Sequence, residues 1–202
     1  MIKRVVGVHF SPMGKVAAIT DKVAEELAAG LAAESAIEVR CESCEINNIA
    51  GCGFDEETVV VVGMPSCIGK LPLPGLSAIR EIRGNGAMMI GLVTFGTRSC
   101  GNALYEMLHY AEEQGFVPVG AGSFSIKEGR EEAMKFCEAA CGKLKRLAGS
   151  SIDGLRITPA PLDISGKLPV HTVSRFSPKL AEAAERLREK ISFGRERSEW
   201  YL

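Results

Sequence analysis

The chain has 202 residues, of which 46% are hydrophobic, and its formal net charge is −1. This length supports one large domain with a sizeable core, and the near-neutral charge excludes a general electrostatic attraction to nucleic acid. No apolar run approaches the ~20 residues that span a bilayer, and the first apolar run is shorter than the ~7–15 residues of a secretory signal core. We therefore expect a cytoplasmic protein that does not span a membrane.

Five apolar runs predict strands at about 3–9, 37–41, 57–63, 88–95 and 117–125. Most of them are continuous rather than alternating, which is typical of strands buried on both faces of a parallel sheet. Helical periodicity lies between them, at about 14–33, 76–83, 101–114 and 129–148. The connection 42–56 has little helical signal, so we expect a turn or a short helix there. This alternation predicts an α/β fold with a doubly wound, five-stranded parallel sheet.

The composition changes at about residue 149, where Gly, Pro and Ser begin to recur. We predict a domain over 1–148 and a C-terminal extension over 149–202. Within the extension we expect an irregular segment up to about 177 and a further helix over 178–192, whose apolar residues share one face. The tail carries Trp200, and it either docks on a partner subunit, docks on the core or frays. The aromatic tail and the further helix together suggest a homodimer.

Seven cysteines are scattered along the chain, and in a reducing compartment such thiols stay unpaired. Cys41 and Cys44 form a C-x-x-C at the end of a predicted strand, without the second ligand pair of a zinc site. Cys137 and Cys141 lie four residues apart on an apolar helix face, which predicts core positions. We therefore expect structural thiols and no metal site.

The loops after the first, third and fourth predicted strands consist of small and turn-forming residues, at 11–16, 64–72 and 94–102. In an open parallel sheet such loops meet at the carboxyl edge, where ligands bind. The first loop leads into a long predicted helix, and the amides at a helix N-terminus attract anions such as phosphate. Lys15 lies at that helix start, which is a poor place for a cation unless an anion is bound.

These segments resemble the flavodoxin family, and in particular proteins in which a flavodoxin domain precedes a ferredoxin-type iron–sulfur domain. The residues that carry the resemblance lie at 10–14, 63–72, 82–86, 94–98 and 114–116, within a match over about 1–148. Residues 163–169 resemble the connector that leads to the clusters in those proteins, but no C-x-x-C-x-x-C follows it. The resemblance implies the strand order 2-1-3-4-5 and a non-covalently bound flavin mononucleotide (FMN).

The resemblance also implies roles for individual residues. Five would hold the FMN phosphate, namely Ser11, Met13, Gly14, Lys15 and Val16. Two further groups would bracket the isoalloxazine ring, namely Pro65, Ser66, Cys67, Ile68 and Gly69, and Thr94, Phe95, Gly96, Thr97 and Arg98. No catalytic side chain is implied, because the flavin itself carries the redox chemistry. The expected function is electron transfer or flavin-dependent reduction with a redox partner that the sequence does not name.

The chain departs from the family pattern T/S-x-T-G-x-T in the phosphate loop. Met13 and Val16 replace two hydroxyl donors, each worth about 1.5–3 kcal/mol to a charged acceptor, and Lys15 would restore part of this as a point charge. Cys67 stands where relatives often place a stacking aromatic residue, which leaves Phe95 as the candidate stacker.

Two alternatives remain open at this stage. One is a degenerate binding module or subunit that keeps the fold but no longer holds flavin, favoured by Met13 and Val16. The other is a thiol redox sensor that uses Cys67 and Cys100, the latter with a pKa lowered by the helix that follows it. For His9, at the end of the first predicted strand, we favour core packing.

Overall fold

A computed structural model of the chain describes residues 2–33, 38–49, 53–96, 99–126, 129–149, 151–152, 155–156, 162, 166, 168 and 199–202. The strands are β1 (Arg4–His9), β2 (Arg40–Glu45), β3 (Thr58–Pro65), β4 (Met88–Phe95), β5 (Val117–Ser125), β6 (Ser151–Ile152), β7 (Leu155–Arg156) and β8 (Glu199–Tyr201). The helices are α1 (Lys15–Ala32), η1 (Ile46–Asn48, a 3₁₀-helix), α2 (Leu73–Glu81), α3 (Ala103–Glu113) and α4 (Gly129–Gly149).

Six strands form one sheet in the order β2-β1-β3-β4-β5-β8. The first five run parallel, and their order 2-1-3-4-5 is the predicted doubly wound arrangement, with its switch point between β1 and β3. β8 is a sixth strand that the sequence did not predict, and it pairs antiparallel with β5. The remaining two strands, β6 and β7, form a separate short hairpin.

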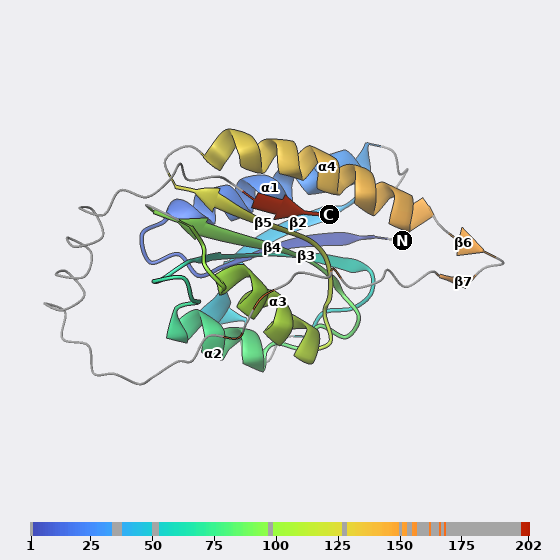
Figure 1. The fold of residues 1–202 in the computed structure, drawn as a ribbon. Coiled ribbons are helices and arrows are strands. Elements are labelled where there is room, and N and C mark those ends of the chain that lie inside the picture. The colour runs from blue at the N-terminus through green and yellow to red at the C-terminus, as the bar shows by residue number, and fades with distance from the viewer. Residues whose placement is uncertain are drawn as a thin grey trace, which may run out of the picture.

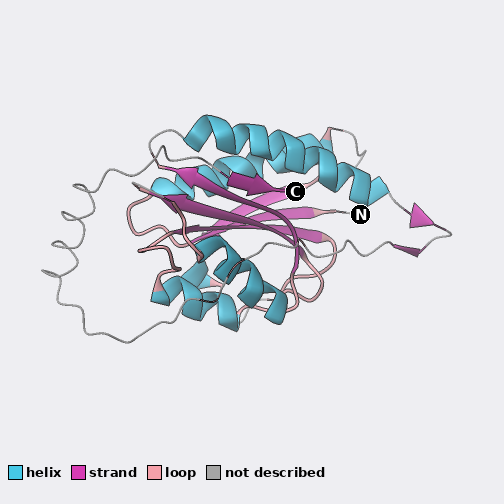
Figure 2. Ribbon diagram, viewed as in Figure 1, coloured by secondary structure: helices cyan, strands magenta, loops and turns pink. Residues whose placement is uncertain are grey.

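Helices cover both faces of the sheet, α1 and α4 on one and α2 and α3 on the other (Figure 1). The same layering is visible in Figure 2, where the strands lie between two pairs of helices. Each face has its own core. On the first, Leu27 and Phe136 pack with Val61, and on the second Ile79 and Met107 pack with Val62. β3 contributes side chains to both cores because successive side chains along a strand point to opposite faces of the sheet.

The strand predictions hold best where burial is complete. β3 and β4 have almost no exposed residue, and their continuous apolar sequences predicted them within a few residues. The prediction for β2 was wrong in position, since the strand spans Arg40–Glu45 rather than 37–41. It is an exposed edge strand of mostly polar residues, so no apolar run marks it. Cys41 and Cys44 therefore both lie within β2 and not at the end of the strand.

The helix predictions differ mainly at the start of α2. This helix begins at Leu73, three residues before the predicted start, because Pro72 is extended at the N-cap and Pro74 suits the first turn. Of the two forms expected for the connection 42–56, a turn or a short helix, the structure has a short helix, η1. The helix predicted over 178–192 and most of the predicted irregular segment lie outside the described residues.

The tail docks on its own chain. Trp200 pairs with Gly122 in the β5–β8 ladder, and its ring centroid lies 6.1 Å from that of Phe136 on α4. Leu202 packs against the same core. The tail is therefore paired with the core of its own chain rather than frayed. Within the described residues, no helix has an apolar stretch long enough to cross a bilayer.

Candidate functional site

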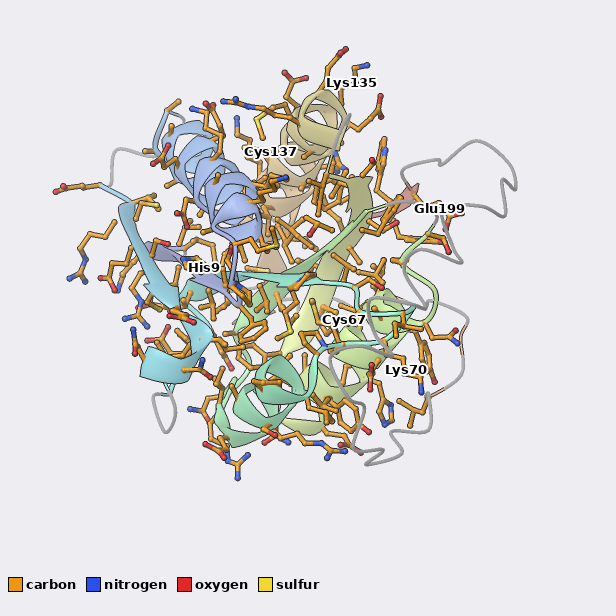
Figure 3. The ribbon with its side chains drawn as sticks, turned by 90° about the vertical axis from the view of Figure 1, so that its left-hand side faces the viewer. His9, Cys67, Lys70, Lys135, Cys137 and Glu199 are labelled. Atoms are coloured by element: carbon orange, nitrogen blue, oxygen red, sulfur yellow. The ribbon has the colours of Figure 1, made fainter. Side chains whose placement is uncertain are left out.

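The sheet brings the three predicted loops to one edge. β1, β3 and β4 are neighbours, with His9 opposite Gly63 and Pro65 opposite Thr94. The loops that leave these strands therefore start side by side at the carboxyl ends. Figure 3 looks at the side of the molecule that is on the left in Figure 1, with His9 below α1 and with Cys67 and Lys70 on the loop before α2.

The first loop ends in a helix N-terminus whose N-cap residue, a glycine, offers no side-chain cap. Gly14 is the N-cap residue of α1, with φ of 74°, and no acidic residue lies in the first turn. One amide is satisfied locally, since the Ala17 N–H donates to Ser11 Oγ at 2.9 Å. In the described part of the chain, the amides of Met13, Lys15 and Val16 have no acceptor. The Lys15 and Val16 amides lie in the first turn of an 18-residue helix and the Met13 amide lies just before it, and unpaired amides at the positive end of a helix suit an anion.

The side chains of Met13 and Val16, the two departures from the family's phosphate-loop pattern, offer no hydrogen-bond donor to an anion at this helix start. Met13 is 82% exposed. Val16 is buried, and its side chain faces Gly63 together with that of Thr20, whose hydroxyl donates to the Val16 carbonyl. Only the backbone of these two residues is available to a ligand, and the exposed Lys15 is the nearby cation on the same turn.

The second loop is a tight turn with a strained residue at its tip. Cys67 and Lys70 exchange backbone hydrogen bonds of 2.8 and 3.2 Å. The two residues between them, Ile68 and Gly69, have φ of 58° and 77°. These positive values are those of a type I′ turn, which is unfavourable for a β-branched residue. Ile68 is nevertheless 63% exposed, so the loop presents an apolar side chain at the sheet edge.

The second and third loops are joined by short polar contacts. The Ser66 amide donates to the Thr94 carbonyl at 2.7 Å, and the Ser66 hydroxyl donates to the Cys100 carbonyl at 3.0 Å. The Asn102 amide donates to the Gly69 carbonyl at 2.9 Å. A Cβ added to Gly101 would lie 2.5 Å from Gly69 Cα, so the close approach of the two loops requires glycine.

The third loop corrects two predictions. Phe95 is only 2% exposed and belongs to the core on the α2–α3 face, so it presents no open ring face on which a flavin would stack. Cys100 is buried, and burial raises the pKa of its thiol, although a hydrogen bond with Ser123 opposes this. The predicted lowering of that pKa was wrong because burial outweighs the effect of the helix start. Thr97 and Arg98 lie outside the described residues, and Gly96 borders open space.

Two buried polar atoms mark the same edge. Among the described residues, His9 Nδ1 and Thr94 Oγ1 are the buried side-chain atoms without a hydrogen-bond partner. Alternation along β1 and β4 places both on the face covered by α1, because Val5 and Leu92 belong to that core. Buried polar atoms in proteins are nearly always hydrogen-bonded, so these two atoms indicate a position suited to a bound ligand or water.

His9 belongs to a polar cluster that sequence reasoning missed. Its Nε2 lies 3.8 Å from Asp21 Oδ1, and the same carboxylate oxygen accepts a hydrogen bond from the Ser43 hydroxyl. The carboxylate lies between the other two groups, so the order is not that of a Ser-His-Asp triad. The three residues come from β1, α1 and β2, and no spacing in the sequence links them.

A hollow of about 630 Å³ lies between α1 and α4, away from the carboxyl-edge loops, and is lined in part by Cys137 and Cys141. Burial raises the pKa of the Cys137 thiol to about 12, and its sulfur donates weakly to the Val23 carbonyl at 3.6 Å. The predicted core positions of both cysteines are confirmed. A thiol protonated at neutral pH is a poor ligand, and the described residues contain no cluster of three or more His, Cys, Asp or Glu suited to a metal ion.

Comparisons with known proteins give similarities to solved structures alone. No family model matches the chain, and no curated protein matches it. Among solved structures, flavodoxin 1 from Bacillus cereus is 20% identical, with a TM-score of 0.49 over 71% of this chain and 99% of that one. An azoreductase from Bacillus anthracis is 12% identical, with a TM-score of 0.43 over 73% and 99%. A response regulator from Colwellia psychrerythraea is 10% identical, with a TM-score of 0.44 over 71% and 99%.

The chain has a flavodoxin-like fold. Its own strand order, 2-1-3-4-5 for the parallel strands, decides this. A fold does not establish a function, so the function has to be argued from the loops at the carboxyl edge.

Proposed function

We propose that this protein binds FMN at the carboxyl edge of its sheet and acts in electron transfer or flavin-dependent reduction. The observation that carries the proposal is the start of α1, where the amides of Met13, Lys15 and Val16 have no acceptor within the described chain. Backbone amides at a helix N-terminus are suited to a phosphate monoester. The unpartnered Thr94 Oγ1 at the same edge supports a ligand there.

The residues fit such a ligand in two parts. The three amides and the Lys15 ammonium would hold the phosphate. Ser66 to Gly69, on a loop fixed to the third loop, would face the ring, and the exposed Ile68 side chain offers an apolar surface for it. The bound flavin supplies one- and two-electron chemistry, while the loops orient it and limit its contact with water. Thr97 and Arg98 are predicted to complete the second side of the ring.

A second candidate is a module with this fold that no longer holds flavin. It is favoured by the local capping of the Ala17 amide by Ser11 and by the side chains of Met13 and Val16, which supply no donor. In this case the edge of the sheet would serve as a binding surface without a redox group.

The two candidates are separated by flavin binding itself. The absorbance spectrum of the purified protein is recorded, and ligand-free protein is titrated with FMN while its fluorescence is followed. Our proposal expects saturable binding of one FMN per chain and flavin absorbance bands that the bound protein retains through gel filtration. A colourless protein with no saturable FMN binding would leave only the second candidate.

A further inference from the structure

A buried carboxylate on α3, that of Glu106, is hydrogen-bonded to the end of the second loop (64–72). Glu106, in the first turn of α3, is completely inaccessible to solvent. Its Oε2 accepts a hydrogen bond of 2.8 Å from the Leu71 amide. Glutamate is almost never fully buried, because removing a carboxylate from water costs several kcal/mol unless hydrogen bonds or opposite charge replace the water. The complete burial of Glu106 at this position therefore calls for a structural or functional explanation.

The position of Glu106 in α3 offsets part of that cost. It lies one turn after the N-cap residue Asn102, where the amides of the first turn give a positive potential. A hydrogen bond from a backbone amide to a carboxylate is also stronger than one to a neutral acceptor. The first turn of α3 therefore stabilises the negative charge that the Leu71 amide binds.

Leu71 is the point at which the second loop ends and turns toward α2. Its side chain is 2% exposed and packs in the core on the α2–α3 face. The other end of the loop is held by the Ser66 amide on the Thr94 carbonyl, and the middle by the Asn102 amide on the Gly69 carbonyl. Glu106 supplies a further tie, which is made by a charged side chain from another element.

We propose that Glu106 is a positioning residue for the flavin: it fixes the loop 64–72 in the conformation that faces the isoalloxazine ring. The role rests on the proposed function, because the ring is what the loop would contact. Glu106 and the loop 64–72 belong to the part of the proposed site that would contact the ring, which is separate from the phosphate position at the start of α1. A loss of Glu106 should therefore weaken FMN and riboflavin by the same factor, since the two ligands share the ring and differ in the phosphate.

The test compares Glu106→Ala and Glu106→Gln with the control Glu113→Gln, which changes an exposed carboxylate at the end of the same helix. Hydrogen exchange is measured on the ligand-free proteins. In Glu106→Ala the amides of Leu71 and of residues 66–70 should exchange about 10- to 100-fold faster, with exchange in α1 unchanged. Glu106→Gln, whose amide oxygen is still an acceptor, should recover part of the protection.

Binding is then measured for both ligands. Glu106→Ala should weaken FMN and riboflavin equally, by about tenfold or more, Glu106→Gln should weaken them less, and Glu113→Gln should leave both unchanged. Unaltered exchange at Leu71, a rise that is equal throughout β3 and β4, or a loss confined to FMN would each overturn the role of Glu106. If the unmodified protein binds neither ligand, the proposed function fails and the flavin role fails with it, while the exchange data still decide whether Glu106 anchors the loop.

Discussion

One glycine sets how closely α1 approaches the sheet. A Cβ on Gly63 would overlap the Thr20 hydroxyl, which is bonded to the Val16 carbonyl, and would also press on the Val16 side chain. We expect Gly63→Ala to lower the free energy of unfolding by about 1–3 kcal/mol through overpacking. Urea titration measures this. Gly96→Ala is the matched control, because a Cβ there meets no atom within 4 Å, and a large loss in that variant would contradict the steric account.

The buried thiol of Cys137 predicts a loss of stability at high pH. Burial raises its pKa from 9.0 to about 12 in the folded chain, whereas the thiol of the unfolded chain titrates near its ordinary value. Between these two values the unfolded state binds fewer protons, so stability falls as pH rises, by up to ~1.4 kcal/mol per pH unit for this thiol. Unfolding measured from pH 7 to 10.5 should show the fall above about pH 9. Cys137→Ala should show a shallower fall, and an identical slope would refute the assignment.

At the scale of elements, the short tail strand closes the sheet edge. β8 pairs with β5, and Trp200 contacts Phe136 on α4 although its ring is partly exposed. We expect Trp200→Ala to cost about 1–3 kcal/mol from lost apolar burial and the lost aromatic pair. An exposed β5 edge also favours self-association. Thermal unfolding and light scattering test both effects, and a variant as stable and as monodisperse as the unmodified chain would show that β8 does not protect this edge.

The elements also show which parts of the fold could be predicted. β3 and β4 were accessible from the sequence because burial on both faces leaves a continuous apolar run. β2 was misplaced because an exposed edge strand carries polar residues. β8 was missed because three residues form a strand only where β5 offers a free edge, which is a tertiary property. The apolar pattern along a strand can be seen in its own sequence, whereas its pairing with another strand depends on the tertiary structure.

Some features of the candidate site could likewise be predicted from the sequence, and others could not. Local sequence indicated the loops and the helix start, since small residues and a lysine at the first helical position are visible in one segment. It did not show that the Phe95 side chain lies in the core. That depends on which face of the sheet the last residue of β4 points to, and on the helices that cover that face. Nor did it connect Glu106 with Leu71, which lie 35 residues apart.

At the scale of the whole molecule, we propose that a phosphate binds at the start of α1 and a ring binds against the adjoining loops. The most direct measurement is the affinity for FMN and for riboflavin in the unmodified chain, in Lys15→Ala and in the control Lys22→Ala, a lysine of the same helix paired with Glu26 at 2.7 Å. We predict that Lys15→Ala weakens FMN by about 10- to 100-fold and leaves riboflavin unchanged, while Lys22→Ala alters neither. Equal affinities for FMN and riboflavin in the unmodified chain, or an equal loss of both in Lys15→Ala, would contradict a phosphate at this helix.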